Sequence, residues 1–242
     1  MIFLFTDFSN NGSYVGQMKT ILADQIGSNI IIDLMHDAPK FNPKASAYLL
    51  ASLIPYLPEE SVILAVVDPG VGNHDRRSLI IKADKRCYVG PDNGLFNSII
   101  KNAREVQVSE ITWRPDRLSN SFHGRDLFAP VAAMLIKGKQ PECKPLSVEE
   151  VVPHDWPQQM DEIIYIDHFG NVVTGLLGDN FSPDSVVKIG DHQFNYARTF
   201  SDVKKGEGFW YINANGLIEV ALNQGSAAME FGFVIGDVIQ KN

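Results

Sequence analysis

Apolar runs alternate with amphipathic stretches along the first part of the chain. Three continuous apolar runs, IFLFT, NIIID and SVILAVVD, end next to Asp7, at Asp33 and at Asp68, and each predicts a strand that is buried on both faces. Between these runs, residues 14–25 and 46–56 have the pattern of helices. Strand, helix, strand, helix, strand at this spacing predicts a parallel sheet covered by helices.

The same pattern continues to about residue 137. SLIIKA and CYVG predict a hairpin-like pair of strands, and a helix over residues 96–101 and a strand around Val106 follow. A further helix is expected to open after Gly124 and to end near Lys137, with Asp126 as its N-terminal cap. We therefore expect an α/β N-terminal domain over residues 1–150, with a mostly parallel, helix-covered sheet.

The residue composition and the hydrophobic pattern change after Gly138. The stretch GKQPECKPLSVEEVVPHDWPQQ carries four of the 13 prolines and predicts a domain boundary near residues 140–160, with a linker over residues 151–159. Short strand-like runs separated by Gly, Asn and Asp follow. They predict a smaller C-terminal β domain over residues 160–242, antiparallel and barrel-like.

Composition narrows the class of protein. An apolar content of 45% and a charged content of 21% are typical of a core-forming globular chain. The net charge of -8 argues against nucleic acid or an anionic membrane as partner, and no apolar stretch approaches the ~20 residues that cross a bilayer. Cys87 and Cys143 are too few for a disulfide framework, so we expect a reducing, cytoplasmic location.

Two carboxylates follow predicted parallel strands directly. Asp7 and Asp68 stand at carboxyl ends, where open α/β sheets bind ligands, so both are expected on one rim. Asp68 also opens the loop DPGVGNHDRR, which carries Arg76 and Arg77 but lacks the spacing of a Walker or GxGxxG phosphate loop. The alternative interpretation of this loop is a plain turn with surface arginines.

Two further segments carry candidate functional groups. His123 in SFHGRD precedes a predicted helix, whose N-terminal dipole favours neutral imidazole; a structural hydrogen bond is the alternative role. In YIDHFGNVVT, Asp167, Phe169 and Asn171 alternate, so they share one face if the segment is a strand. The alternative is a strand that ends in a turn at Gly170. The histidines lack the spacing of metal ligands, so no metal site is expected.

Six segments in order carry a resemblance to a known family: TDF…GSYVGQMK, VVDPGVG…RR, PDNGLF, SFHGRDLFAP, DHFGNVVT and LIEVALNQGSAA. Together they resemble the S-adenosylmethionine (SAM) hydroxide adenosyltransferases, or adenosine-forming SAM hydrolases, which are relatives of the fluorinase and chlorinase. The resemblance implies a two-domain subunit in a homotrimer, with the substrate between neighbouring subunits. It also implies hydrolysis of SAM to adenosine and L-methionine by attack of water or hydroxide at C5′, with SAM as substrate and without a cofactor.

The resemblance also assigns the catalytic group and the ribose contact. Asp68, Arg76 and His123 match the triad that handles the water nucleophile in the hydrolases, and Asp7 matches the aspartate that binds the ribose. The loop after Gly72 is one residue longer than usual, and the RRSLII match selects Arg76 over Arg77.

The remaining substrate contacts are assigned in the C-terminal domain. Asp167 matches the aspartate that meets the methionine ammonium, and Phe169 and Asn171 fall where the family contacts adenine. Ala214 replaces a serine that holds the methionine carboxylate, so Asn215 or backbone N–H groups are expected to compensate.

Two alternatives stay open at this point. One is a SAM-dependent halogenase, against which Asp68 argues because a carboxylate repels halide. The other is a non-catalytic SAM- or adenosine-binding module. Two departures from the family pattern favour this second alternative: Ala214, and Ser9 in place of the glycine of TDFG.

Overall fold

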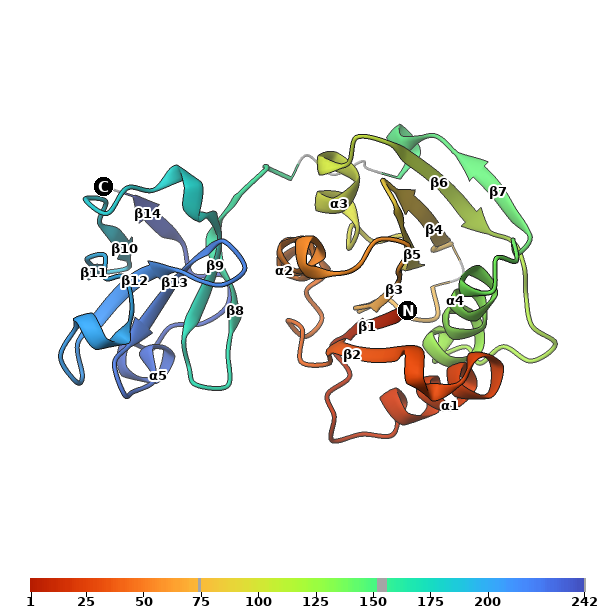
Figure 1. The fold of residues 1–242 in the computed structure, drawn as a ribbon, viewed down its shortest axis with the longest axis horizontal. Helices are drawn as coiled ribbons and strands as arrows, with labels where there is room; N and C mark the ends of the chain where they lie inside the picture. Colours follow the sequence, from red (N-terminus) through yellow and green to blue (C-terminus); the bar gives the residue numbers. More distant parts are fainter. Residues whose placement is uncertain (74, 152–155, 242) are drawn as a thin grey trace. The chain divides into compact units, whose positions relative to one another are not determined.

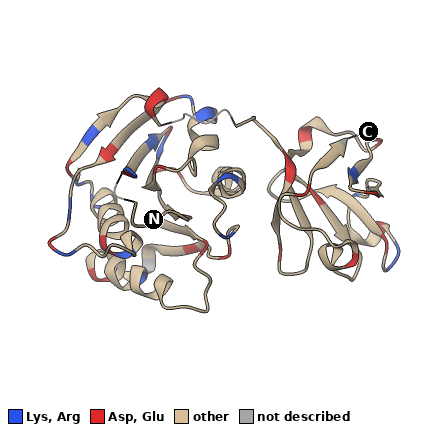
Figure 2. Ribbon diagram, turned by 180° about the vertical axis from the view of Figure 1, so that it is seen from behind, with Lys and Arg blue, Asp and Glu red and all other residues tan. Residues whose placement is uncertain are grey.

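The structure is a computed structural model that describes residues 1–73, 75–151 and 156–241. It divides into two compact units, one of residues 1–47 and 56–151 and one of residues 48–55 and 156–241 (Figure 1). Of the linker predicted over residues 151–159, residues 152–155 lie outside the described residues. Lys and Arg are interspersed with Asp and Glu in each unit (Figure 2).

The first unit is built on one seven-stranded mixed sheet with the strand order β2-β1-β3-β5-β4-β6-β7. The first four strands in this order are parallel, and the other three are antiparallel to their neighbours because the β4–β5 hairpin reverses the chain. The strands are β1 (Ile2–Thr6), β2 (Ile31–Met35), β3 (Val62–Val66), β4 (Ser78–Ala83), β5 (Arg86–Pro91), β6 (Val106–Ile111) and β7 (Cys143–Leu146). The expected α/β sheet is confirmed, with its parallel part at one side.

Helices cover the sheet because its central strands are apolar on both faces. Every residue of β1 and β3 is buried. Met18 and Leu22 of one helix and Val131 of another pack with these strands in a single core. Figure 1 shows α3 on the opposite side of the strands from α1 and α4. The helices of this unit are α1 (Tyr14–Ile26), α3 (Asn97–Asn102) and α4 (Ala129–Ile136), while α2 (Pro43–Leu53) has residues in both units.

Two predicted boundaries are shifted. A 3-10 turn over Ser28–Ile30 delays the second strand to Ile31–Met35. The expectation that this strand is buried on both faces is wrong, because it is the end strand of the sheet order and none of its residues is fully buried. The second helix begins at Pro43, a residue that suits a first helical turn because it has no N–H to leave unpaired. It ends at Leu53 and a 3-10 turn over Ile54–Tyr56 follows.

The second unit holds two antiparallel sheets, ordered β12-β13-β9-β8 and β11-β10-β14, which confirms the smaller antiparallel domain. One hydrophobic core, with Trp210 and Ile218 from the first sheet and Val187 and Ile239 from the second, joins them. Its elements are β8 (Met160–Ile166), β9 (Val172–Leu177), β10 (Val187–Ile189), β11 (His192–Phe194), β12 (Gly208–Ile212), β13 (Leu217–Leu222), α5 (Ala227–Phe231) and β14 (Ile239–Lys241). Further 3-10 turns lie at Val148–Glu150, Gly178–Asn180 and Phe200–Asp202.

Candidate active site

A cavity of about 540 Å³ opens at the carboxyl ends of the parallel strands in the first unit. Asp7 directly follows β1, and Asp68 lies two residues beyond β3, its parallel neighbour. Both carboxylates line this cavity together with His123. The prediction that Asp7 and Asp68 share one rim is therefore confirmed, because adjacent parallel strands end on the same edge.

Asp7 is half-buried in the cavity wall. Its Oδ2 accepts a hydrogen bond from the backbone N–H of Phe41 at 3.1 Å. Burial raises the pKa of the Asp7 carboxyl and the charge of Asp68 adds to this, whereas the Phe41 bond opposes it. Ser9, which replaces the family's glycine, has a φ of 60°, in the left-handed region that glycine adopts without strain.

The glycine-rich loop after β3 brings an arginine onto Asp68. Asp68 Oδ1 accepts hydrogen bonds from the backbone N–H of Gly70 at 3.0 Å and from Nη1 of Arg76. A Cβ atom on Gly70 would lie 2.8 Å from Cζ of Arg76, so a glycine is needed where the guanidinium passes. This arrangement places a fixed positive charge against a carboxylate of the cavity wall.

Arg77 points to other partners. Its Nε donates to Oδ2 of Asp92 at 2.7 Å, and its Nη2 donates to the carbonyl oxygen of Glu150 at 2.5 Å. The structure therefore brings Arg76, and not Arg77, to Asp68. This placement agrees with the residue selected from the sequence.

His123 stands at the start of a π-helical turn over Gly124–Phe128 that runs into α4. The expected cap at Asp126 is wrong, because no side chain caps this turn and the Asp126 carboxylate instead accepts the backbone N–H of Ser119 at 2.8 Å. Arg125 donates to both carboxylate oxygens of Asp126 and lowers the pKa of that carboxyl.

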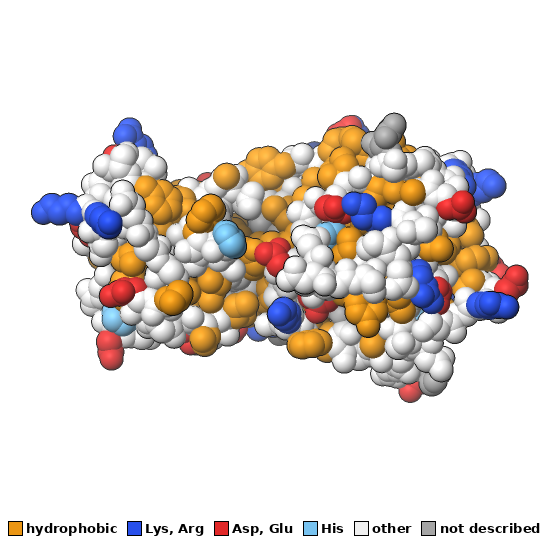
Figure 3. Space-filling view, turned by 90° about the horizontal axis from the view of Figure 1, so that it is seen from below, with side chains coloured by type: hydrophobic (Ala, Val, Ile, Leu, Met, Phe, Trp, Pro, Cys, Tyr) orange, Lys and Arg blue, Asp and Glu red, His pale blue; other side chains and the backbone are white. Residues whose placement is uncertain are grey.

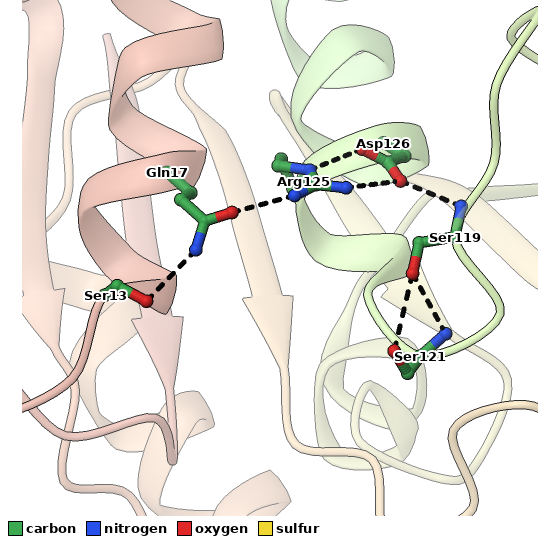
Figure 4. Close-up of polar contacts among 6 residues, drawn as sticks. All are labelled: Ser13, Gln17, Ser119, Ser121, Arg125 and Asp126. Carbon is green, nitrogen blue, oxygen red and sulfur yellow. Dashed lines mark hydrogen bonds and ion pairs between the residues drawn. The ribbon is translucent and has the colours of Figure 1, made fainter.

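The same arginine ties the His123 loop to the first helix (Figure 4). Arg125 Nη1 donates to Oε1 of Gln17 in α1 at 2.8 Å, and Gln17 in turn donates to Oγ of Ser13 at 3.1 Å. The contacts of Arg125 with Asp126 and Gln17 hold both sides of the loop, so their effect is to fix the backbone that carries His123.

Aromatic rings form a further part of the wall. Phe8, Tyr14 and Phe122 line the cavity and contact one another, with ring centroids 4.8 Å apart for Tyr14 and Phe122. Sequence reasoning missed these rings although each lies in a segment that carries the family resemblance, because attention went to the charged and polar residues beside them. Large apolar side chains are also exposed on each unit (Figure 3), and Phe41, at 74% exposed, is one that lines this cavity.

A second cavity, of about 670 Å³, lies in the second unit and is lined by Asp167, Phe169 and Asn171. Of the two arrangements considered from the sequence, the structure has the turn at Gly170: β8 ends at Ile166 and β9 begins at Val172, so the three residues lie between the strands and share no strand face. Asp167 accepts the backbone N–H groups of Phe169 and Asn171 at 2.9 and 2.8 Å and the Asn171 amide at 2.9 Å.

This turn leaves Phe169 free to meet a ligand, because its side chain is 75% exposed. Gly170 has a φ of 84°, and a Cβ atom there would lie 2.6 Å from Cβ of Ser226, so the turn requires glycine. Asn215 is not among the lining residues; it lies in the turn between β12 and β13, where its N–H donates to Oδ1 of Asn213 at 2.9 Å.

Three further residues of the second cavity, Phe200, Tyr211 and Glu219, were not predicted. Glu219 had a signal in the sequence: it is the single charged residue in the apolar strand LIEVAL. Within residues 1–73, 75–151 and 156–241, no group of three His, Cys, Asp or Glu side chains is placed to hold a metal ion. In that same part of the chain, no helix combines the length and apolar character needed to cross a membrane.

Fold and sites together define a two-domain protein with an aspartate–arginine pair and a histidine at the carboxyl edge of a mixed sheet. Residues 2–144 match the family model of the SAM hydroxide adenosyltransferase N-terminal domain, and residues 161–240 match that of its C-terminal domain. The chain belongs to the SAM hydroxide adenosyltransferase family.

Named relatives agree with this assignment, and a solved structure shares the fold. The chain is 34% identical to a (R)-S-adenosyl-L-methionine hydrolase of Thermus thermophilus, over 97% of this chain and 96% of the relative. It is 34% identical to a protein of the same name from Salinispora tropica, over 96% and 94% of the two chains. A crystal structure of an uncharacterized conserved protein from Thermotoga maritima superposes with a TM-score of 0.89 at 30% identity, over 100% and 99% of the two chains.

Proposed function

We propose that the protein hydrolyses S-adenosyl-L-methionine to adenosine and L-methionine. The observation that carries the proposal is the cavity that holds Asp68 and His123, with Arg76 on Asp68. The identity to (R)-S-adenosyl-L-methionine hydrolases over nearly the whole chain supports the choice of substrate.

In the proposed reaction, a water molecule lies between Asp68 and His123. Its oxygen attacks C5′ of the substrate in line with the sulfur, so the O–C5′ bond forms as the C5′–S bond breaks. The electron pair of the broken bond stays on sulfur, which becomes the neutral thioether of methionine. The proton of the water passes to the Asp68–His123 pair, and the Arg76 guanidinium stabilises the developing hydroxide.

The surroundings suit this charge-neutralising reaction. The negative charge of hydroxide and the positive charge of the sulfonium cancel along the reaction path. Water therefore stabilises the reactants more than the transition state, and a dry pocket favours the reaction. Phe8, Tyr14 and Phe122 supply apolar wall around the carboxylates. The Asp68 carboxylate in the same wall disfavours a halide as nucleophile.

Substrate binding is assigned to both cavities. Asp7 binds the ribose hydroxyls from the first cavity, while Phe169 and Asn171 contact adenine and Asp167 meets the ammonium from the second. SAM is the substrate, and no cofactor or metal takes part. We place the enzyme in the cytoplasm as a homotrimer, with each site formed by the N-terminal domain of one subunit and the C-terminal domain of its neighbour.

The catalytic assignment is tested with His123→Ala and Arg76→Ala. Each variant is expected to bind SAM with wild-type affinity and to lose about 100-fold or more in turnover. Wild-type turnover in both variants would overturn the assignment.

The shared site is tested by mixing two inactive variants. His123→Ala and Asp167→Ala each damage a different domain, so a mixed trimer regains some sites with both halves intact. Recovery of activity after subunit exchange supports a site between subunits. If mixed oligomers are shown to form and activity does not recover, a site between subunits is contradicted.

A further inference from the structure

The wall of the second cavity contains a buried acid that the proposed reaction does not use. Glu219 lies in the middle of β13, opposite Tyr211 of β12 and Val173 of β9, and is 6% exposed. It nevertheless lines the cavity. Burial of an ionisable side chain opposes folding unless its charge is compensated, so this position needs a reason.

The protein compensates Glu219 only in part. The Tyr211 hydroxyl donates to Oε1, and Nδ2 of Asn213 donates to Oε2 at 2.9 Å. An ionised carboxylate has about four acceptor positions, so roughly half of them stay available to a donor in the cavity. The Asp167 carboxylate, by contrast, already accepts three hydrogen bonds from residues of its own turn.

The charge of Glu219 also lacks a partner among the described residues, where no Lys, Arg or His forms an ion pair with it. Burial raises the pKa of the Glu219 carboxyl, and the negative charge of Asp167 raises it further, against the two hydrogen bonds. Two carboxylates in one cavity therefore favour a ligand that is positively charged and donates hydrogen bonds.

We propose that Glu219 is a specificity-determining residue that, beside Asp167, selects the ammonium group of the substrate; this inference rests on the proposed function. An ammonium group donates three hydrogen bonds and matches the acceptor positions that Glu219 leaves open. The sulfonium group of SAM has no N–H, and the proposed attack at C5′ places it near Asp68 instead.

The test compares two inhibitors that differ only in the ammonium group. S-adenosyl-L-homocysteine carries it, and the deamino analogue has hydrogen in its place. The inhibition constants of both compounds against SAM hydrolysis give a selectivity ratio, which we expect to favour the amino compound by about tenfold or more in the wild-type enzyme. Glu219→Gln is expected to lower this ratio several-fold, chiefly by weakening the amino compound, while Asp167 retains part of the preference.

Two control variants separate charge from structure. Glu230→Gln removes an exposed carboxylate of the same unit and is expected to keep the wild-type ratio. Tyr211→Phe removes a hydrogen bond to Glu219 but keeps its charge, so it is expected to retain most of the selectivity.

Several outcomes overturn the inference. If Glu219→Gln weakens both inhibitors equally, Glu219 acts only through the shape of the cavity. If Tyr211→Phe lowers the selectivity as much as Glu219→Gln, the hydroxyl and not the carboxylate selects. If the wild-type enzyme hydrolyses SAM and Glu219→Gln keeps the wild-type selectivity ratio, the role of Glu219 is refuted and the proposed function is not. A wild-type protein that neither hydrolyses SAM nor binds either inhibitor refutes the proposed function and this inference with it.

Discussion

Substitution of Gly70 by alanine is expected to disable the enzyme while leaving its fold intact. The backbone of Gly70 does not have a positive φ, so alanine fits its conformation. The added Cβ atom, however, would lie 2.8 Å from Cζ of Arg76. Because the crowded atom belongs to the end of a flexible side chain, the guanidinium moves and the backbone does not.

The size of the effect follows from this distance. Carbon atoms in ordinary contact are about 3.5–4.0 Å apart, so the guanidinium must shift by about 1 Å from its place against Asp68. A displacement of about 1 Å in a catalytic group lowers the rate by about 100-fold. The free energy of unfolding is expected to change by less than about 1 kcal/mol, because glycine-to-alanine replacements at compatible positions are mildly stabilising.

The assay is steady-state release of adenosine from SAM, alongside thermal unfolding. Gly16→Ala is the matched control: a Cβ atom there, in α1, meets nothing within 4 Å, so turnover should stay at the wild-type level. Arg76→Ala and the Gly70→Ala/Arg76→Ala double variant complete a cycle, and the double variant should be no slower than Arg76→Ala alone. Wild-type turnover in Gly70→Ala, or losses that multiply in the double variant, would show that Gly70 does not act by leaving room for the Arg76 guanidinium.

Three further predictions concern separate parts of the molecule. Arg77→Ala, which breaks the bond to Asp92, should cost about 1 kcal/mol of stability in urea unfolding but leave kcat unchanged; a large loss of kcat would reassign the catalytic arginine. Phe169→Ala should leave the melting temperature unchanged because the ring is 75% exposed, yet raise the KM for SAM by about 5- to 100-fold, as expected for loss of base stacking; an unchanged KM would contradict the adenine contact. Because burial raises the pKa of Glu219 in the folded state, its ionisation destabilises the fold as the pH rises through that pKa. Glu219→Gln should therefore be more stable than wild type near pH 7.5, and this gain should vanish below the unfolded-state pKa, near 4.5; urea unfolding at both pH values checks the sign.

The strand pattern was sufficient to place Asp7 and Asp68 together. Continuous apolar runs predicted buried parallel strands, and parallel neighbours end on one edge, so the position of both carboxylates followed from chain direction alone. The position of Arg76 relative to Asp68 required the structure, because the path of a glycine-rich loop depends on close contacts such as that between Gly70 and Arg76.

One local prediction failed and another stayed undecided for a common reason. Asp126 and Asp167 each have a short acidic side chain that binds backbone N–H groups in several geometries. Asp126 was predicted to cap a helix but holds the preceding loop, and for Asp167 a strand face and a turn were both open, of which the structure has the turn. The sequence pattern around each is compatible with both arrangements.

Glu219 shows what a single sequence does not reveal. Its contacts with Tyr211 and Asn213 depend on the register of the β12–β13 hairpin, which the sequence pattern alone does not fix. A charged residue in an apolar strand was visible, but its partners and its access to the cavity were not.

The central claim is attack of water at C5′ of SAM, and isotope labelling tests it most directly. Purified protein is incubated with SAM in oxygen-18 water, with and without chloride and a chelator, and the products are analysed by mass spectrometry. We predict that the heavy oxygen appears in adenosine, with unlabelled methionine, whatever the chloride or chelator content. Label in another product, or formation of a 5′-halogenated adenosine when chloride is present, would contradict the account.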